Sequence, residues 1–169
     1  ECMIALPFHP SIAYTVHELQ ANPEKIFAEV EAAANKQLGG KVTMDLRRSI
    51  VDGKVTCDQG VIVGCSGGMY ENIVEAAHIL DGQSIGNGYF DMSVYPSSTP
   101  ISLAITKNGA AAKLMEAGCV MKPAFCGPCF GAGDTPANNA LSIRHATRNF
   151  ANREGSKPSE GQFAGVCLM

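Results

Sequence analysis

The pattern of apolar and polar positions begins with one strong helical signal. Pro23 and Glu24 follow Asn22, and both residue types favour the first turn of a helix. Two glycines after Leu38 are typical of a helix end, because glycine readily adopts the left-handed conformation found there. We therefore predict a helix between Asn22 and residues 39–40. Its apolar face consists of Ile26, Phe27, Val30, Ala33 and Ala34.

The remainder of residues 1–58 has a less regular pattern. Two prolines interrupt the apolar positions of residues 1–19, for which we expect an irregular opening segment. Residues 42–51 and 54–57 have the composition of strands, and Asp52-Gly53 between them is a dipeptide that favours a tight turn. These two stretches are predicted to form a hairpin.

From residue 59 onward, short apolar runs alternate with helical patterns. Residues 61–63 form a β-branched run, which is typical of a strand buried on both faces, and residues 70–80 then predict a helix. This alternation predicts an α/β fold with a parallel or mixed sheet covered on both faces. Further strands are expected over 90–94, 119–121 and 141–146, with helices from Thr99 onward and over 110–116.

Composition narrows the class of protein. Apolar residues make up 46% and charged residues 17% of the 169 residues, which indicates one ordinary folded domain over 1–169. The net charge of −3 and the lack of a basic block argue against nucleic-acid binding. No apolar run reaches the ~20 residues of a membrane helix, and no signal peptide is visible. A cytoplasmic domain is therefore expected.

The two ends of the chain suggest a larger parent protein. The chain begins at Glu1 rather than Met and stops in an apolar run over residues 165–169. Natural C-termini are usually more polar than this. We therefore expect a piece of a longer polypeptide, in which 1–58 supply the opening segment, helix and hairpin, and 59–169 supply the α/β core.

The 7 cysteines fall into two groups. Cys2, Cys57, Cys119 and Cys167 are interpreted as small buried or half-buried apolar residues. Cys65 instead follows the strand predicted over 61–63, and a C-x-x-C pair, Cys126 and Cys129, lies in a long loop after the strand over 119–121. Two arginines, Arg148 and Arg153, follow a third predicted strand. Since ligands of open α/β sheets bind beyond the carboxyl ends of strands, we expect all of these residues at one edge. 

The C-x-x-C pair alone is compatible with several kinds of site. Cys126 and Cys129 could form a thioredoxin-like redox pair, although no amphipathic helix follows them. They could bind zinc, with His145 as a further ligand, or be inert core residues. Glycines after Cys65 also resemble a phosphate cradle, but the lysine of a P-loop is missing.

An iron–sulfur cluster accounts for more of these residues. Three thiolates, from Cys65, Cys126 and Cys129, can hold three irons of a cubane and leave the fourth open as a Lewis acid. Arg148 and Arg153 could bind substrate carboxylates in two-bond forks, although each arginine alone could equally be a solvated surface residue. The neighbouring glycines would let the backbone approach the cluster (Gly64, Gly67, Gly68 and Gly127).

These motifs resemble the aconitase superfamily. Residues 64–72 (GCSGGMYEN) resemble its first cluster-cysteine segment, and residues 124–131 (AFCGPCFG) resemble its Cys-Gly-Pro-Cys segment. Residues 147–153 (TRNFANR) resemble its substrate loop, and residues 7–10 (PFHP) resemble the opening of its third domain. The order and spacing match from about Pro7 to the end of the chain, so the combined set is highly specific.

The resemblance implies a three-layer α/β/α domain of a hydro-lyase, a hydratase/dehydratase or isomerase acting on a di- or tricarboxylic hydroxy acid. It implies a [4Fe–4S] cluster on Cys65, Cys126 and Cys129, and substrate carboxylates bound by Arg148 and Arg153. The family's catalytic base and further substrate residues lie on other domains. We therefore expect no catalytic residue in this chain and no turnover by the isolated chain.

The chain also departs from the family pattern at two places. Ser66-Gly67-Gly68 replaces the usual Thr-Asn after the first cysteine, and Thr147 stands where an Asn is usual. Both changes remove an amide and indicate a divergent member. A non-catalytic iron–sulfur domain that senses iron or oxidants is therefore kept as an alternative.

Overall fold

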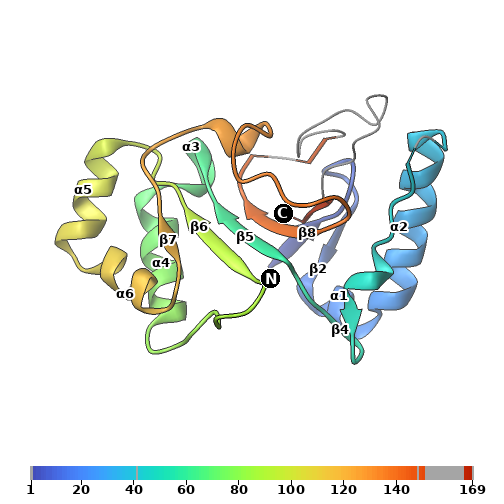
Figure 1. Cartoon of the computed structure of the whole chain (residues 1–169), viewed down its shortest axis with the longest axis horizontal. Helices are drawn as coiled ribbons and strands as arrows, with labels where there is room; N and C mark the ends of the chain where they lie inside the picture. The colour runs from blue at the N-terminus through green and yellow to red at the C-terminus, as the bar shows by residue number, and fades with distance from the viewer. Residues whose placement is uncertain (1, 41, 148, 151–165, 169) are drawn as a thin grey trace. The chain divides into compact units, whose positions relative to one another are not determined.

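A computed structural model describes residues 2–40, 42–147, 149–150 and 166–168, the last three by their backbone (Figure 1). The chain divides into two compact units. The first comprises residues 1–57, 135–143 and 148–169, and the second comprises residues 58–134 and 144–147. The expected division of a single domain into residues 1–58 and 59–169 stays a prediction.

The opening segment of the first unit is a hairpin, so the expectation of irregular structure over residues 1–19 is wrong. β1 (Met3–Ala5) pairs antiparallel with β2 (Ala13–Thr15), and the two prolines lie in the connection between them. α1 (Val16–Ala21) follows with a capping box. The Glu18 N–H donates to the Thr15 hydroxyl over 3.0 Å, and the Thr15 N–H donates to the Glu18 carboxylate over 2.8 Å. This pair of bonds satisfies backbone donors that the start of a helix otherwise leaves unpaired.

The predicted long helix is confirmed as α2 (Pro23–Leu38), which ends at Gly39 with φ of 65°. Its buried face contains the expected residues except Ala33, which is exposed. Together with β1, α1 and the segment after α2, this face forms the core of the first unit. That core consists of Ile4, Leu6, Leu19, Ile26, Phe27, Val30, Ala34, Leu38, Met44, Leu46 and Leu141.

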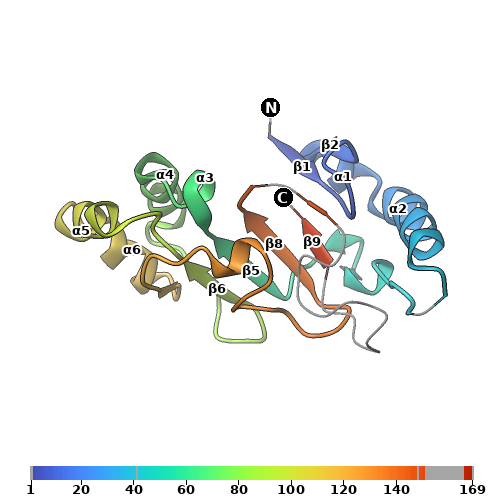
Figure 2. The ribbon, with the colours of Figure 1, turned by 90° about the horizontal axis from the view of Figure 1, so that it is seen from above.

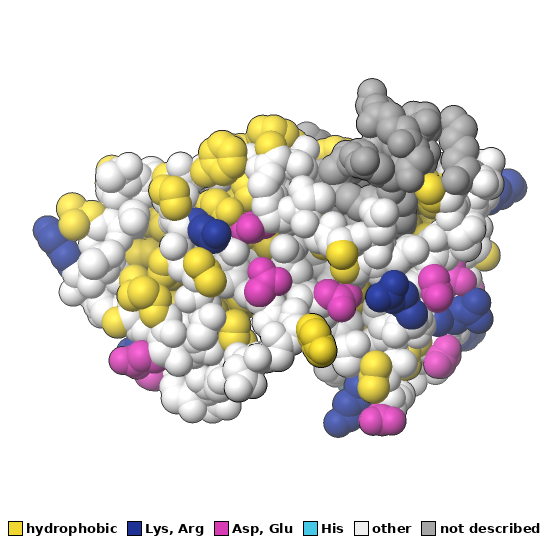
Figure 3. All heavy atoms as spheres, in the orientation of Figure 1, with side chains coloured by type: hydrophobic (Ala, Val, Ile, Leu, Met, Phe, Trp, Pro, Cys, Tyr) yellow, Lys and Arg dark blue, Asp and Glu magenta, His cyan; other side chains and the backbone are white. Residues whose placement is uncertain are grey.

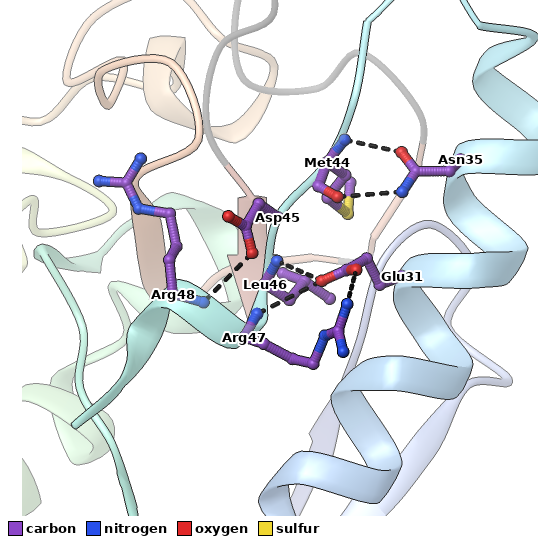
Figure 4. Close-up of polar contacts among 7 residues, drawn as sticks. All are labelled: Glu31, Asn35, Met44, Asp45, Leu46, Arg47 and Arg48. Carbon is purple, nitrogen blue, oxygen red and sulfur yellow. Dashed lines mark hydrogen bonds and ion pairs between the residues drawn. The ribbon is translucent and has the colours of Figure 1, made fainter. Parts of the chain in front are cut away.

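The strand predicted over residues 42–51 is mostly wrong. Within residues 42–51, which the structure describes, the strand is limited to β3 (Ile50–Val51), and a 3-10 turn, η1 (Arg47–Ser49), precedes it. The backbone before η1 is bound by two side chains of α2, as Figure 4 shows. Asn35 exchanges two hydrogen bonds with Met44, of 3.0 and 2.7 Å, and the Leu46 N–H donates to Glu31 over 2.9 Å. Because helix side chains satisfy these backbone groups, no partner strand is needed.

The predicted turn at Asp52-Gly53 is confirmed. β3 pairs antiparallel with β4 (Lys54–Val55), with Ile50 opposite Val55. Asp52 and Gly53 both have positive φ, of 51° and 74°, which is the conformation of a two-residue hairpin turn.

The second unit contains the predicted alternation of strands and helices. β5 (Gln59–Ile62), β6 (Asp91–Val94) and β7 (Val120–Met121) pair in parallel in the order β7-β6-β5. A four-residue helix, α3 (Gly64–Gly67), continues from β5, followed by α4 (Tyr70–Leu80). Along the chain, α5 (Thr99–Lys107) and α6 (Ala110–Glu116) follow β6 and precede β7, and their N-caps are Ser98 and Gly109. The α/β fold with a parallel sheet is thereby confirmed.

Helices α4, α5 and α6 contact one another, and both ribbon views show them together (Figures 1 and 2). They bury one face of the strands, on which Ile62 and Val94 are opposite each other. Every residue of β5 is buried, which is typical of a parallel strand covered on both faces and explains the short apolar run in its sequence. The shared core consists of Ile62, Ile73, Ala77, Val94, Ile105, Ala110, Ala111, Leu114 and Cys119.

β8 (Leu141–His145) contributes to both units. In the first unit, Leu141 to Ile143 pair in parallel with β9 (Val166–Leu168). In the second unit, the His145 carbonyl oxygen accepts a hydrogen bond from the Val63 N–H over 3.0 Å. Across the parts of the chain that the structure describes, no helix is long and apolar enough to cross a membrane.

Candidate functional site

Cys65 lies in α3, directly after β5. This segment is a short helix that begins at Gly64 and leaves the Cys65 side chain exposed. Gly64 has φ of 85°, which L side chains rarely adopt. This conformation lets the chain leave β5 and enter α3 within one residue.

Cys126 directly precedes a 3-10 turn, η2 (Gly127–Cys129), and Cys129 is the last residue of this turn. Cys126 is exposed, whereas Cys129 is buried. The turn closes through a hydrogen bond of 3.1 Å from the Cys129 N–H to the Cys126 carbonyl oxygen. The N–H groups of Phe130 and Ala132 both donate to the Gly127 carbonyl oxygen, over 3.0 and 2.9 Å. The pair therefore belongs to a compact loop that folds back on itself.

The structure brings the two cysteine segments together at Gly64. The Cys129 Sγ lies 2.4 Å from the place that a Cβ on Gly64 would take, so glycine at this position leaves room for the sulfur. Cysteine thiolates are the usual ligands of an iron–sulfur cluster, so the three cysteines of these segments are of the residue type that such a cluster needs. Among the described residues, however, no three His, Cys, Asp or Glu side chains are gathered closely enough to hold a metal ion.

Gly67 and Gly68, where the sequence departs from the resembled pattern, are closely packed against the backbone. A Cβ on Gly67 would collide with the His145 carbonyl oxygen, and one on Gly68 would collide with the Tyr95 carbonyl oxygen. The Ser66 hydroxyl donates to the Ala146 carbonyl oxygen over 3.0 Å. These residues therefore connect α3 to the ends of β6 and β8, and a larger side chain at either glycine would separate them.

Asn72 supplies an amide close to α3. Its side chain donates to the Ser66 carbonyl oxygen over 2.7 Å and so tethers the end of α3 to α4. The Asn72 amide therefore has a structural role, which is to join α3 to α4.

A buried arginine, Arg144, holds the loop of the cysteine pair. Its side chain donates to the carbonyl oxygens of Pro128 and Asp134 and to the Gln59 side chain. Arg144 was not among the sequence candidates, because charged and polar residues of a strand are normally expected at the surface. In β8 the pattern is reversed: Ser142 and Arg144 are buried, and Ile143 is exposed. The one sequence signal for a special role of Arg144 was its charge within the strand predicted over residues 141–146.

Tyr95 and Asp134 close the other side of this loop. The Tyr95 hydroxyl donates to the Asp134 carboxylate over 2.8 Å. Burial, followed by this hydrogen bond and the Asp134 charge, raises the pKa of Tyr95 to about 12. Burial also raises the pKa of Asp91, with a smaller contribution from the charge of Asp134.

The other sequence candidates have different outcomes. Arg148 and Arg153 lie outside the described residues, so their contacts with carboxylates remain predictions. His145, considered as a zinc ligand, is exposed. Of the cysteines interpreted as buried or half-buried, Cys119 is buried and Cys57 is half-buried, as expected, but Cys2 is exposed. The side chain of Cys167 is not described.

Exposed aromatic side chains flank the cysteine pair. Phe125 and Phe130 are 53% and 60% exposed. The face in Figure 3 shows hydrophobic side chains gathered over the segment that follows β7 and over the helices of the second unit. Apolar surface of this kind often marks a region that another protein surface covers.

Comparison with known proteins identifies the family. A model of the aconitase family (aconitate hydratase) matches residues 1–168, almost the whole chain. The chain belongs to the aconitase family.

Individual members of the aconitase family agree with this assignment. The 3-isopropylmalate dehydratase large subunit of Nitratidesulfovibrio vulgaris (strain DSM 19637 / Miyazaki F) is 36% identical over 115 residues, which are 68% of this chain and 27% of that subunit. The large subunit from Hydrogenobaculum sp. (strain Y04AAS1) is 33% identical over 116 residues, again 68% and 27%. The one from Oleidesulfovibrio alaskensis is 31% identical over 165 residues, which are 89% of this chain and 38% of that subunit. The chain therefore spans between about a quarter and two fifths of these relatives.

Proposed function

We propose that this aconitase-family chain is the cluster-binding part of a hydro-lyase that acts on a di- or tricarboxylic hydroxy acid. In this proposal Cys65, Cys126 and Cys129 ligate a [4Fe–4S] cluster, and Arg148 and Arg153 bind substrate carboxylates. The packing of the Cys129 Sγ against Gly64 carries the proposal, because it brings the loop of the C-x-x-C pair next to Cys65.

The residues of this chain would hold and orient the reactants. The exposed thiols of Cys65 and Cys126 are accessible, while Cys129 is buried against the backbone. When bound, a cluster with an open iron supplies a Lewis acid for the substrate hydroxyl. The planar guanidiniums of Arg148 and Arg153 would fix the direction of the substrate through two-bond contacts with its carboxylates.

Other parts of a longer protein would complete the site. The relatives are longer than this chain, and Phe125 and Phe130 expose apolar surface on both sides of the cysteine pair. We propose that the remaining domains of the parent protein cover this surface and supply the catalytic base. The thiols must stay reduced to bind iron, which supports a cytoplasmic location.

Anaerobic reconstitution with iron and sulfide tests the cluster. We expect a visible absorbance band from the reconstituted chain that is lost in Cys126→Ala. Cys2→Ala is the matched control, because Cys2 is also exposed but lies in the first unit. Absence of the band from the unsubstituted chain, or its persistence in Cys126→Ala, would contradict the proposal.

The alternative is an aconitase-like domain that binds a cluster or senses iron or oxidants without catalysis. The tight packing of Gly67 and Gly68 favours it, since it leaves no room there for the amide usual in the family. Assays of the longer protein with hydroxy acids separate the two functions, because only the hydro-lyase would turn over a substrate.

A further inference from the structure

Arg144 connects three parts of the second unit that are far apart in the sequence. The side chain is only 2% exposed. Its Nη1 donates to the Pro128 carbonyl oxygen over 2.7 Å, and its Nη2 donates to the Gln59 Oε1 over 3.0 Å. Nη2 also donates to the Asp134 carbonyl oxygen over 2.5 Å. One guanidinium therefore joins the end of β8, the start of β5 and the cysteine loop.

The positions of the acceptors indicate what these bonds hold in place. Pro128 lies between the two cysteines, and Asp134 lies at the far end of the same loop. Fixing both carbonyl groups determines where the loop lies over the strands. The Tyr95 hydroxyl binds the carboxylate of Asp134 and restrains that end a second time.

The same bonds restrain the backbone next to the Cys129 sulfur. Cys129 directly follows Pro128, whose carbonyl group is bound by Arg144. Its Sγ packs against Gly64, and Gly64 begins α3 immediately after the strand that carries Gln59. Arg144 thus binds both the loop of the cysteine pair and the strand leading to Cys65.

We propose that Arg144 is a positioning residue that holds the Cys129 thiol in place for the cluster. Its planar guanidinium offers five N–H donors in a rigid fork, which suits several fixed acceptors at once. A lysine ammonium keeps the charge but lacks the fork. The role of Arg144 in cluster binding rests on the proposed function. Its role in holding the Cys129 thiol in place does not.

Thiol reactivity tests the positioning without any metal. We expect Arg144→Gln to raise the alkylation rate of Cys129 at least about tenfold, because a buried thiol reacts once its cover opens. Arg144→Lys should give an intermediate rate. Alkylation is followed by peptide mass spectrometry, with the buried Cys119 as an internal reference for general unfolding. An unchanged Cys129 rate in a folded Arg144→Gln chain would overturn the proposal.

Two controls separate this effect from a loss of the fold. Lys113→Gln also removes a cation from the second unit, where Lys113 pairs with Asp81 on the surface, and should leave the Cys129 rate unchanged. If Arg144→Gln does not fold, Gln59→Met tests the same network by removing one acceptor of the guanidinium. A rise of Cys129 alkylation in Gln59→Met without a rise at Cys119 supports the proposal, and equal rises at both cysteines overturn it.

Cluster reconstitution then tests the link to the proposed function. Loss of a supporting residue typically weakens metal binding about 10- to 100-fold. We expect Arg144→Gln to show a weakening of this size, with partial rescue in Arg144→Lys. If the unsubstituted chain binds no cluster, the proposed function fails while the alkylation result still stands. If all variants bind the cluster equally, the positioning role fails and the proposed function stands.

Discussion

At the scale of single residues, Gly64 has two reasons to be glycine. Its φ is 85°, and a Cβ there would meet the Cys129 Sγ. Gly109 in the same unit has a similar φ of 86° but no atom within 4 Å of such a Cβ. Comparing substitutions at the two positions therefore separates the cost of backbone strain from the cost of the contact with the Cys129 sulfur.

We predict that Gly64→Ala lowers the free energy of unfolding more than Gly109→Ala does. Both substitutions incur about 1–2 kcal/mol of left-handed strain, and only the first also displaces a buried thiol. Chemical denaturation measures both changes. Equal losses in the two variants would show that the Cys129 Sγ moves aside at no cost.

Tyr95 gives a prediction for high pH. Its pKa is raised to about 12 by burial first and then by Asp134, against an ordinary value of 10.0. A raised pKa means that the folded chain binds the proton more tightly than the unfolded chain does. The resulting stabilisation is complete below pH 10 and is lost as the pH rises toward about 12.

Ultraviolet titration of tyrosinate measures this pKa. The chain has 4 tyrosines, and we expect the step at the highest pH to disappear in Tyr95→Phe. Tyr89→Phe is the control, because Tyr89 is fully exposed. Loss of the high-pH step in the control instead would refute the assignment.

At the scale of elements, α2 organises the segment after it through Glu31. The carboxylate accepts hydrogen bonds from the Leu46 and Arg47 N–H groups and from the Arg47 guanidinium (Figure 4). Burial by itself raises the pKa of Glu31, but the hydrogen bonds from Arg47 and Leu46 outweigh burial and lower it. A lowered pKa stabilises the fold above the ordinary value of 4.5, and this contribution is lost as the pH falls through the folded-state pKa.

We predict that Glu31→Gln lowers the free energy of unfolding at neutral pH by about 1.5–3 kcal/mol, the usual range for hydrogen bonds to a charged group. The difference should shrink as the solution is acidified, because the wild-type carboxyl then becomes neutral as well. Denaturation at several pH values measures it, with Glu29→Gln on the exposed face of α2 as the control. A difference independent of pH would contradict this account.

At the scale of the whole molecule, we predict that the reconstituted chain does not turn over citrate, isocitrate or isopropylmalate. The proposed site consists of the three thiols, with Arg148 and Arg153 as the proposed substrate ligands, while the family resemblance implies that the catalytic base lies on other domains. Steady-state assays of the 169-residue chain measure this. Turnover by the chain alone would refute the prediction.

The local sequence signals located most of the elements. α2, α4 and α6 have the predicted bounds or nearly so, because helical spacing of apolar residues acts within a few turns of the same helix, and Pro23 and Gly39 mark the two ends of α2. The hairpin at Asp52-Gly53 was predictable for a similar reason, since the two turn residues determine the backbone direction themselves. Local signals failed over residues 42–46, where Asn35 and Glu31 bind the backbone from another element.

By itself, the sequence determined the α/β class, the family and the candidate ligands Cys65, Cys126 and Cys129, because these depend on residue type, order and spacing. Only the tertiary structure decided that Arg144 is buried under the cysteine loop and that the Cys129 Sγ lies against Gly64. The physical reason is that burying a charged or polar group depends on acceptors far away in the chain. Those acceptors, Gln59, Pro128 and Asp134, come together only when the second unit folds.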